Sequence, residues 1–276
     1  METNILIKNI INEIIEKNFS EIDIPKLSEL IKNNNQSKLP IKQLIGKVHL
    51  NEPMFHDENY IRYFYIGISA LKNIYSSLFY ANLNTDSISN VLDFASGYGR
   101  VLRWLQYLFK NADITCSDIN EEAVNFCKET FGVEGVISNS DFSKLNFNKK
   151  FDVIWIGSLL THLNEENWYI CLKRLKCFLK QNGILIFSTH GEDFINKLKA
   201  GKTYNRSPKQ IKKAINDYNK FGFGFMARNI DPKYGLSVTT FNKVHSILLK
   251  VENLQLIRYT NSSWDRFQDV YSLKLT

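Results

Sequence analysis

The sequence predicts an α/β fold for residues 87–276, in which short apolar strands alternate with helices. The first observation is segment 91–101, Val-Leu-Asp-Phe-Ala-Ser-Gly-Tyr-Gly-Arg-Val, where an apolar strand leads through a tight turn into a helix. The second is that further strand-like runs follow it, at 113–117, 134–138, 151–157 and 184–189. The third is composition, because 276 residues with 44% hydrophobic content can bury one large core and an added piece.

The rest of the chain is predicted to extend this core at both ends. Residues 1–86 are expected to form a helical extension, with helices at 5–17, 24–32 and about 57–81. An insertion is expected at about 191–238, after the fifth strand. Two final strands are expected at 254–260 and 267–275, joined by a turn at 261–266. We therefore predict two parts, 1–86 as a cap and 87–276 as the main domain.

The turn after the first strand points to a nucleoside-containing cofactor. Gly97 and Gly99 let the backbone turn tightly, so that amides at a helix N-terminus can approach a polar ligand. Asp118 ends the next strand, 19 positions beyond Gly99, which is the spacing at which a strand–helix–strand unit places an acid on ribose hydroxyls. Leu102 stands where a dinucleotide fingerprint requires a small residue, and this argues against NAD.

Residues 93–99 resemble the cofactor motif of class I S-adenosylmethionine-dependent methyltransferases, with Asp93, Gly97 and Gly99 in the motif positions. Ala95 replaces the first glycine, a mild change if its φ is negative. The resemblance continues through 140–142, similar to the adenine-binding turn, and through 151–163. It implies a Rossmann-like seven-stranded sheet of order 3-2-1-4-5-7-6 with the last strand antiparallel. The cofactor-binding residues that it implies are Asp93, Ala95, Ser96, Gly97, Gly99, Arg100, Asp118, Ile119, Asp141, Phe142, Gly157 and Ser158.

Two histidines are candidates for the general base that a hydroxyl acceptor needs near neutral pH. His190 ends the fifth strand and is followed by Gly191, so its imidazole is expected to face the crevice, and we rank it first. His162 follows the fourth strand and ranks second, because the corresponding segment in related sequences often lies against the cofactor. Structural roles are expected for His49, His56 and His245.

The expected acceptor side comprises the long N-terminal helix, the insertion and the last turn. Its candidate substrate-binding residues are Tyr60, Tyr65, Arg206, Trp264 and Arg266. The formal net charge is +7, and the basic excess gathers between residues 197 and 220. The favoured interpretation of this excess is a solvated helix face, with Ser207 as N-cap and Pro208 as the first helical residue. The alternative interpretation is a contact with a phosphate or carboxylate of a substrate. No aromatic residues interleave a basic stripe there, so nucleic acid is not the favoured partner.

Several reactions are disfavoured by the residues after the fourth strand. No Asn/Asp-Pro-Pro-Tyr motif and no Pro-Cys pair occurs, and Ile156-Gly157-Ser158 offers no carboxylate for magnesium. We therefore expect S-adenosylmethionine as cofactor, S-adenosylhomocysteine as product, no metal, and O-methylation of a small acceptor. Segments 53–55, 187–191 and 268–271 resemble bacterial methyltransferases of glycan assembly, which implies a sugar, sugar nucleotide or surface-glycan precursor. An RNA methyltransferase and a non-catalytic partner protein stay open as alternatives.

The remaining features predict a cytoplasmic protein. The four cysteines, at positions 116, 127, 171 and 177, have no zinc-site or C-x-x-C spacing, as is usual for free thiols in a reducing compartment. No run of 18 apolar residues and no signal-peptide pattern occurs. The sequence does not indicate the oligomeric state.

Overall fold

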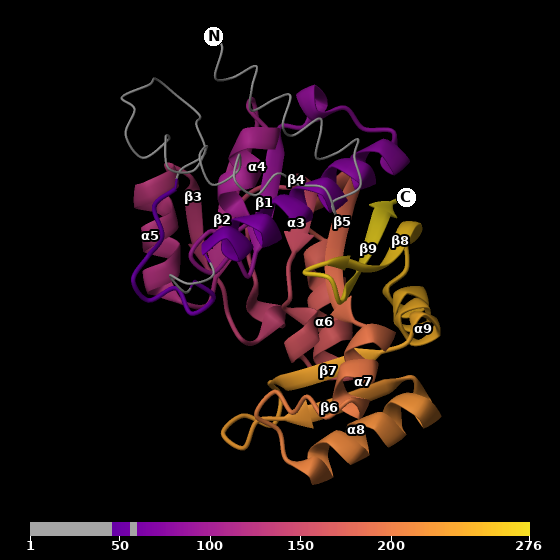
Figure 1. Ribbon diagram of the computed structural model, residues 1–276. Coiled ribbons are helices and arrows are strands. Elements are labelled where there is room, and N and C mark those ends of the chain that lie inside the picture. The colour runs from indigo at the N-terminus through magenta and orange to yellow at the C-terminus, as the bar shows by residue number, and fades with distance from the viewer. Residues whose placement is uncertain (1–45, 56–59) are drawn as a thin grey trace.

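The computed structural model describes residues 46–55 and 60–276. Figure 1 shows a twisted sheet flanked by helices, with a smaller lobe extending from the carboxyl ends of its central strands. The predicted helices at 5–17 and 24–32, together with His56, lie outside the described residues.

The sheet has seven strands in the order β3-β2-β1-β4-β5-β9-β8. Strands β1 to β5 are parallel neighbours, whereas β9 is antiparallel to both β5 and β8. This is the predicted order, and the predicted antiparallel final strand is confirmed. The strands are β1 (Asn90–Phe94), β2 (Asp113–Asp118), β3 (Glu134–Ile137), β4 (Phe151–Ile156), β5 (Leu179–His190), β8 (Leu254–Trp264) and β9 (Gln268–Leu275).

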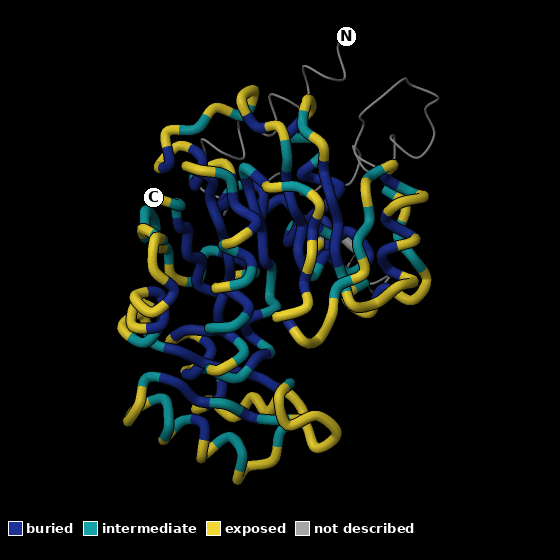
Figure 2. Tube along the Cα trace, turned by 180° about the vertical axis from the view of Figure 1, so that it is seen from behind, coloured by how far each residue is buried: buried dark blue, intermediate teal, exposed yellow. Residues whose placement is uncertain are grey.

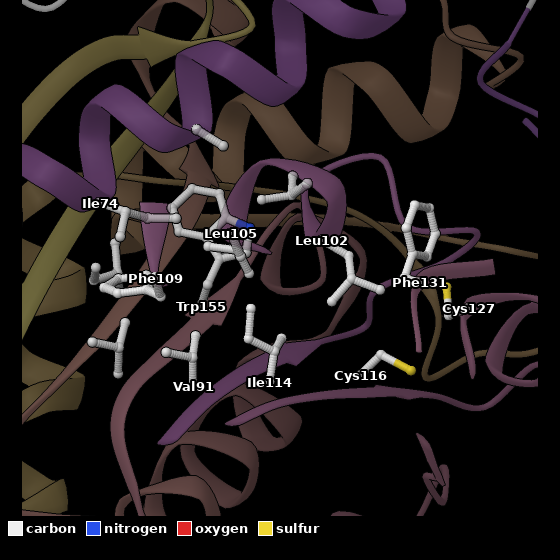
Figure 3. Close-up of a cluster of buried hydrophobic side chains, with 14 of the residues drawn as sticks. Ile74, Val91, Leu102, Leu105, Phe109, Ile114, Cys116, Cys127, Phe131 and Trp155 are labelled. Atoms are coloured by element: carbon white, nitrogen blue, oxygen red, sulfur yellow. The ribbon is translucent and has the colours of Figure 1, made fainter. Parts of the chain in front are cut away.

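Helices cover both faces of the sheet because alternate residues of each buried strand point to opposite sides. In β4, Val153 and Trp155 join the core beneath α3 (Tyr60–Ala81), α4 (Leu102–Leu108) and α5 (Glu121–Phe131). Ile154 and Ile156 join the other core, beneath α6 (Glu165–Lys176) and α9 (Phe241–Val251). Figure 3 shows part of the first core, and Figure 2 shows that the buried backbone is concentrated in the sheet.

Helix α3 is fastened to the sheet by polar as well as apolar contacts. Its Ser77 hydroxyl lies 2.6 Å from the Ser272 hydroxyl in β9, and Asn73 donates to the Ser263 carbonyl oxygen at 3.0 Å. The indole of Trp264 donates to the Ile66 carbonyl oxygen at 2.9 Å. The predicted boundary at residues 86 and 87 therefore falls between elements that share one core.

The insertion after β5 forms the smaller lobe in Figure 1. It contains α7 (Glu192–Lys199), α8 (Pro208–Phe221) and a hairpin of β6 (Phe223–Ala227) and β7 (Gly235–Thr239). Helix α8 begins with a complete capping box between Ser207 and Gln210, as the sequence predicts for its start. The predicted turn at 261–266 is shorter in the structure, since β8 continues to Trp264.

Candidate functional site

The turn after β1 is built from residues in the left-handed region of backbone space. Ala95 has φ +60°, Gly97 +51° and Gly99 +81°. A side chain at Gly99 would also collide with Phe131, because a Cβ there would lie 2.6 Å from the ring. The condition that made Ala95 a mild replacement is not met: its φ is positive, and an L-residue pays about 1–2 kcal/mol there.

Asp118 at the end of β2 holds this turn in place. Its Oδ2 accepts from the Gly97 amide at 2.8 Å, and its Oδ1 accepts from the Asn120 amide at 2.9 Å. Asn120 in turn caps α5 by accepting from the Ala123 amide at 3.3 Å. The spacing between glycine turn and acid, noticed in the sequence, thus corresponds to a direct hydrogen bond.

A second acid turn follows β3. The Oδ1 of Asp141 accepts from the Ser143 hydroxyl at 2.6 Å and from its amide at 3.1 Å, and these bonds hold the carboxyl pKa below its usual value. Phe142 is buried, with its ring centroid 6.5 Å from that of Phe94. The exposed carboxyl and the buried ring therefore fix the shape of this loop.

A cavity of about 650 Å³ opens where these loops meet, at the carboxyl edge of the parallel strands. This is the edge at which open α/β sheets bind ligands, and the volume lies within the range of small-molecule sites. One side, which we call the strand-end wall, comprises the lining residues in loops after β1 to β4 and at the start of α6. The other, the hairpin wall, comprises Asp231, Lys233 and Tyr234. The strand-end wall contains Phe94, Ala95, Gly97, Asp118, Ile119, Ser138, Asn139, Ser140, Asp141, Phe142, Gly157, Ser158, Leu159, His162, Leu163, Glu166, Asn167 and Ile170.

Eight of the twelve cofactor-binding residues suggested by the sequence line this cavity. They are Ala95, Gly97, Asp118, Ile119, Asp141, Phe142, Gly157 and Ser158. The other four, Asp93, Ser96, Gly99 and Arg100, are not among its lining residues. These four lie within or beside the same turn, so they shape the cavity from behind it.

Asp93 and Arg100 are two ionisable residues of this turn that have buried polar atoms without a partner among the described residues. Asp93 is 2% exposed and its Oδ2 has no hydrogen-bond partner among the described residues. Burial, together with the nearby Asp118 charge, raises the pKa of Asp93 to about 8, although the Arg100 charge opposes this. Arg100 has a buried Nη1 without a partner in the same described part, and its guanidinium lies 5.8 Å from the Trp264 ring centroid.

The segment after β4 is held by a buried polar network. Ser158 has φ +59°, and its amide donates to the Ser188 hydroxyl at 2.8 Å. The Ser188 hydroxyl donates to Gln268 Oε1 at 2.7 Å, and Gln268 Nε2 donates to the Ser158 hydroxyl at 3.2 Å. This closed network links β4, β5 and β9 and fixes the backbone on which His162 is carried.

His162 lines the cavity in a defined tautomer. Its Nδ1 lies 2.8 Å from the Gly235 carbonyl oxygen, and because a carbonyl only accepts, Nδ1 carries the proton. Burial and the charges of Arg228 and Arg206 lower the pKa of His162, so the ring is neutral at pH 7. Nε2 of the neutral ring then has a free lone pair, which can accept a proton.

His190 lies elsewhere, and the expectation that its imidazole faces the crevice is not met. It is 5% exposed, its Nδ1 is bonded to the Ser237 carbonyl oxygen at 3.1 Å, and its ring stacks on Phe194 with centroids 3.8 Å apart. It is not among the lining residues of the cavity. Burial lowers the pKa of His190 to about 3. The glycine that follows it does turn the chain, but the hairpin packs over the ring.

Tyr65, Arg206, Trp264 and Arg266, four of the five suggested substrate-binding residues, are dispersed, and none of these four lines the cavity. The side chain of Tyr60 is not described. Tyr65 lies under the Arg266 guanidinium, 5.5 Å from ring centroid to charge centre. Trp264 is 1% exposed and serves as a core residue, since its ring packs on Trp155 and its indole is bonded to α3. Arg206 lies beside the hairpin, close enough to Arg228 for its pKa to be lowered by that charge as well as by burial.

The sequence analysis expected the insertion on the acceptor side of the crevice, but it singled out none of the three residues of the hairpin wall. Asp231, Lys233 and Tyr234 lie more than 60 residues beyond Ile170, the last residue of the strand-end wall. The His162 bond to Gly235 and a β-bridge between Leu163 and Tyr234 bring the two walls together. Turn-forming residues between two short strands indicate a hairpin, but not the part of the fold on which it packs.

No cluster of three or more metal-ligating side chains occurs among residues 46–55 and 60–276. Among the helices in those same ranges, none has the length and apolar character that crossing a membrane requires.

Residues 91–183 match the model of the methyltransferase domain family. N-terminal Xaa-Pro-Lys N-methyltransferase 1-B of Xenopus laevis is 35% identical over 101 residues, which are 34% of this chain and 44% of that protein. Malonyl-[acyl-carrier protein] O-methyltransferase of Bacillus cereus is 30% identical over 146 residues, 52% of this chain and 51% of that protein. The chain thus spans about half the length of the curated relatives that it matches.

Solved structures share the fold at low sequence identity. Magnesium protoporphyrin IX methyltransferase of Synechocystis PCC 6803, solved with bound S-adenosylhomocysteine, has a TM-score of 0.51 at 14% identity, covering 84% of this chain and 90% of that one. A S-adenosylmethionine-dependent methyltransferase of Clostridium acetobutylicum has a TM-score of 0.50 at 15% identity, covering 73% and 89%. These likenesses concern the fold, and they agree with the strand order observed here.

Proposed function

We propose that this chain, which has the S-adenosylmethionine-binding methyltransferase fold, transfers a methyl group from that cofactor to a small acceptor. The observation that carries the proposal is the strand-end wall. There the left-handed turn after β1, the Asp118 carboxylate at the end of β2 and the Asp141 loop line one cavity. The matched family segment, 91–183, contains all of these loops.

The residues present fit the cofactor at both of its polar ends. Asp118, which lines the cavity, would accept hydrogen bonds from the ribose hydroxyls, and the Asp141–Phe142 loop would border the adenine. Arg100, whose buried Nη1 is unpartnered among the described residues, would supply positive charge from behind the turn for the carboxylate of the methionine part. When bound, the cofactor supplies an electrophilic methyl group on a sulfonium.

His162 would accept the proton of the acceptor. The Nδ1 bond to Gly235 fixes the ring and leaves Nε2 as the basic nitrogen. His162 lines the cavity whereas His190 does not, so we reverse the order in which the sequence ranked them. The protein's other contribution is alignment, since displacement at a methyl group requires donor and acceptor in line.

The acceptor is proposed as a small molecule methylated on oxygen without a metal. By their names, the relatives above act on protein N-termini and on a malonyl group carried by a protein, and these differ from each other in the atom methylated. A sugar or surface-glycan precursor, suggested by sequence resemblance, is one acceptor class within this proposal. An RNA acceptor and a non-catalytic role remain as outcomes of the test.

Calorimetric titration with S-adenosylmethionine and S-adenosylhomocysteine tests the proposal. We expect saturable binding of one cofactor per chain, weakened in Asp118→Ala and unchanged in Asp113→Ala, a control at the exposed opposite end of β2. Absence of cofactor binding by the folded chain would contradict the proposal and favour the non-catalytic role. Tight RNA binding that falls steeply with salt would favour an RNA acceptor instead.

A further inference from the structure

Two arginines lie close together on the insertion without an acidic partner. Arg206 precedes α8 and Arg228 follows β6, and the charge of Arg228 lowers the pKa of Arg206. Among the ion pairs formed by described residues, none involves either arginine. Two like charges held together destabilise a site unless an anion offsets them.

The fold holds this pair in place through bonds on both sides. Gln210 of α8 donates to the Ala227 carbonyl oxygen at 2.9 Å, which fastens the start of the helix to the end of β6. The Arg228 amide donates to the Tyr234 carbonyl oxygen at 2.8 Å and closes the hairpin. Arg206 has a buried Nε without a hydrogen-bond partner in the described part of the chain, and its Nη1 donates only to the adjacent Asn205 carbonyl oxygen.

Tyr234 connects the pair to the proposed base. The Arg228 guanidinium lies 4.7 Å from the centroid of the Tyr234 ring, and the His162 ring stacks on the same ring with centroids 5.1 Å apart. Lys233, which precedes Tyr234, lines the cavity and adds a third positive charge, against the single negative charge of Asp231 on the same wall. The hairpin therefore carries an electropositive, partly aromatic surface that begins at His162 and extends outward.

We propose that Arg206, Arg228 and Lys233 bind an anionic group, a phosphate or a carboxylate, of the methyl acceptor. This inference rests on the proposed function, because it assigns the substrate class of the same cavity. An acceptor held there by its anion reaches inward past Tyr234, so that its nucleophilic atom lies near His162. Arginine suits this task because its planar guanidinium binds both phosphates and carboxylates through paired N–H groups.

The test titrates the full chain, saturated with S-adenosylhomocysteine, with glycerol phosphate and separately with malonate. We expect one of the two anions to bind, and the double variant Arg206→Gln/Arg228→Gln to weaken that binding at least tenfold. The control Lys209→Gln/Lys212→Gln removes the same charge from the exposed face of α8 and should leave binding unchanged. The anion that binds identifies phosphate or carboxylate as the recognised group.

A second readout follows the imidazole of His162 by NMR. Bound anion should raise the pKa of His162 in the wild type, because negative charge nearby favours the imidazolium, and should not do so in the double arginine variant. Equal loss of binding in the lysine control, or no binding of either anion, overturns the proposal. Because cofactor binding is measured on the same samples, failure of the anion site with intact cofactor binding leaves the proposed function standing.

Discussion

The two walls of the cavity are built in different ways. The strand-end wall is formed mainly by the backbone, since its left-handed residues and turn amides are held by the ends of β1, β2 and β4. The charged side chains that line it are acidic. The hairpin wall is made by side chains of an insertion, and around it gather Arg206, Arg228 and Lys233. We infer that the first wall serves a ligand common to the fold and that the second selects what is particular to this chain.

The two candidate histidines give the sharpest contrast, and replacing His162 has the largest expected consequence. His162→Asn keeps an amide donor for Gly235 but removes Nε2, so kcat should fall by roughly 10²–10⁴-fold while the Kd for cofactor changes little. His190→Asn keeps a donor for Ser237 and should leave turnover near normal. Steady-state kinetics on both variants checks this, and normal turnover in His162→Asn would remove it as the base.

The pH dependence of turnover sharpens the same comparison. Since the pKa of His162 is lowered, the neutral and active ring should persist below pH 6.5, and kcat/KM should begin to fall only at a lower pH. Removing a neighbouring charge in Arg228→Gln should move that fall to higher pH. An unchanged profile in this variant would contradict the placement of the arginine beside the imidazole.

Replacing Asp118, in the strand-end wall, should have the next largest effect, which is a loss of cofactor affinity. Asp118→Ala removes a charge-assisted acceptor of roughly 1.5–3 kcal/mol, so cofactor affinity should fall about 10- to 150-fold. The loss includes the bond that holds the Gly97 amide. Asp118→Asn, which keeps one acceptor oxygen, should lie between the wild type and the alanine variant in calorimetric titration.

His190 should affect stability where His162 affects turnover. Its pKa is about 3 in the folded chain and near 6.5 when unfolded, so the unfolded chain binds more protons between these values. The contribution of His190 to the free energy of unfolding is therefore fully present above pH 6.5 and is lost as pH falls toward 3. His190→Asn should flatten this part of the dependence in urea unfolding series, and an unaltered slope would contradict the buried neutral imidazole.

Replacing Ala95 should have the smallest effect, which is on stability, and it tests whether the positive φ strains the backbone at this residue. Ala95→Gly should raise the free energy of unfolding by about 0.5–1 kcal/mol, because relief of the left-handed strain exceeds the entropy cost of glycine. Gly97→Ala is the matched opposite: nothing lies within 4 Å of the added Cβ, so the variant should lose stability through φ alone. A stabilised Gly97→Ala in urea unfolding would contradict the assigned backbone conformation.

The contrast between the walls also explains what could be predicted from the sequence. The strand order was predicted from the resemblance to class I methyltransferases. The Gly97–Asp118 relation follows from a local pattern, because a turn and the next strand end are neighbours in a strand–helix–strand unit. The position of His190 could not be predicted, since it depends on where β7 packs, and β7 is about 45 residues away along the chain. The positive φ of Ala95 could not be predicted either, because the identity of a residue does not determine its dihedral angle.

Hydrogen–deuterium exchange with and without S-adenosylhomocysteine tests the central claim that the strand-end wall binds the cofactor. The product should slow exchange in peptides that cover residues 94–99, 118–123 and 138–145. It should leave the exposed face of α8 unaffected. Protection confined to the insertion, with the three strand-end loops exchanging as in the free chain, would contradict the assignment of the two walls.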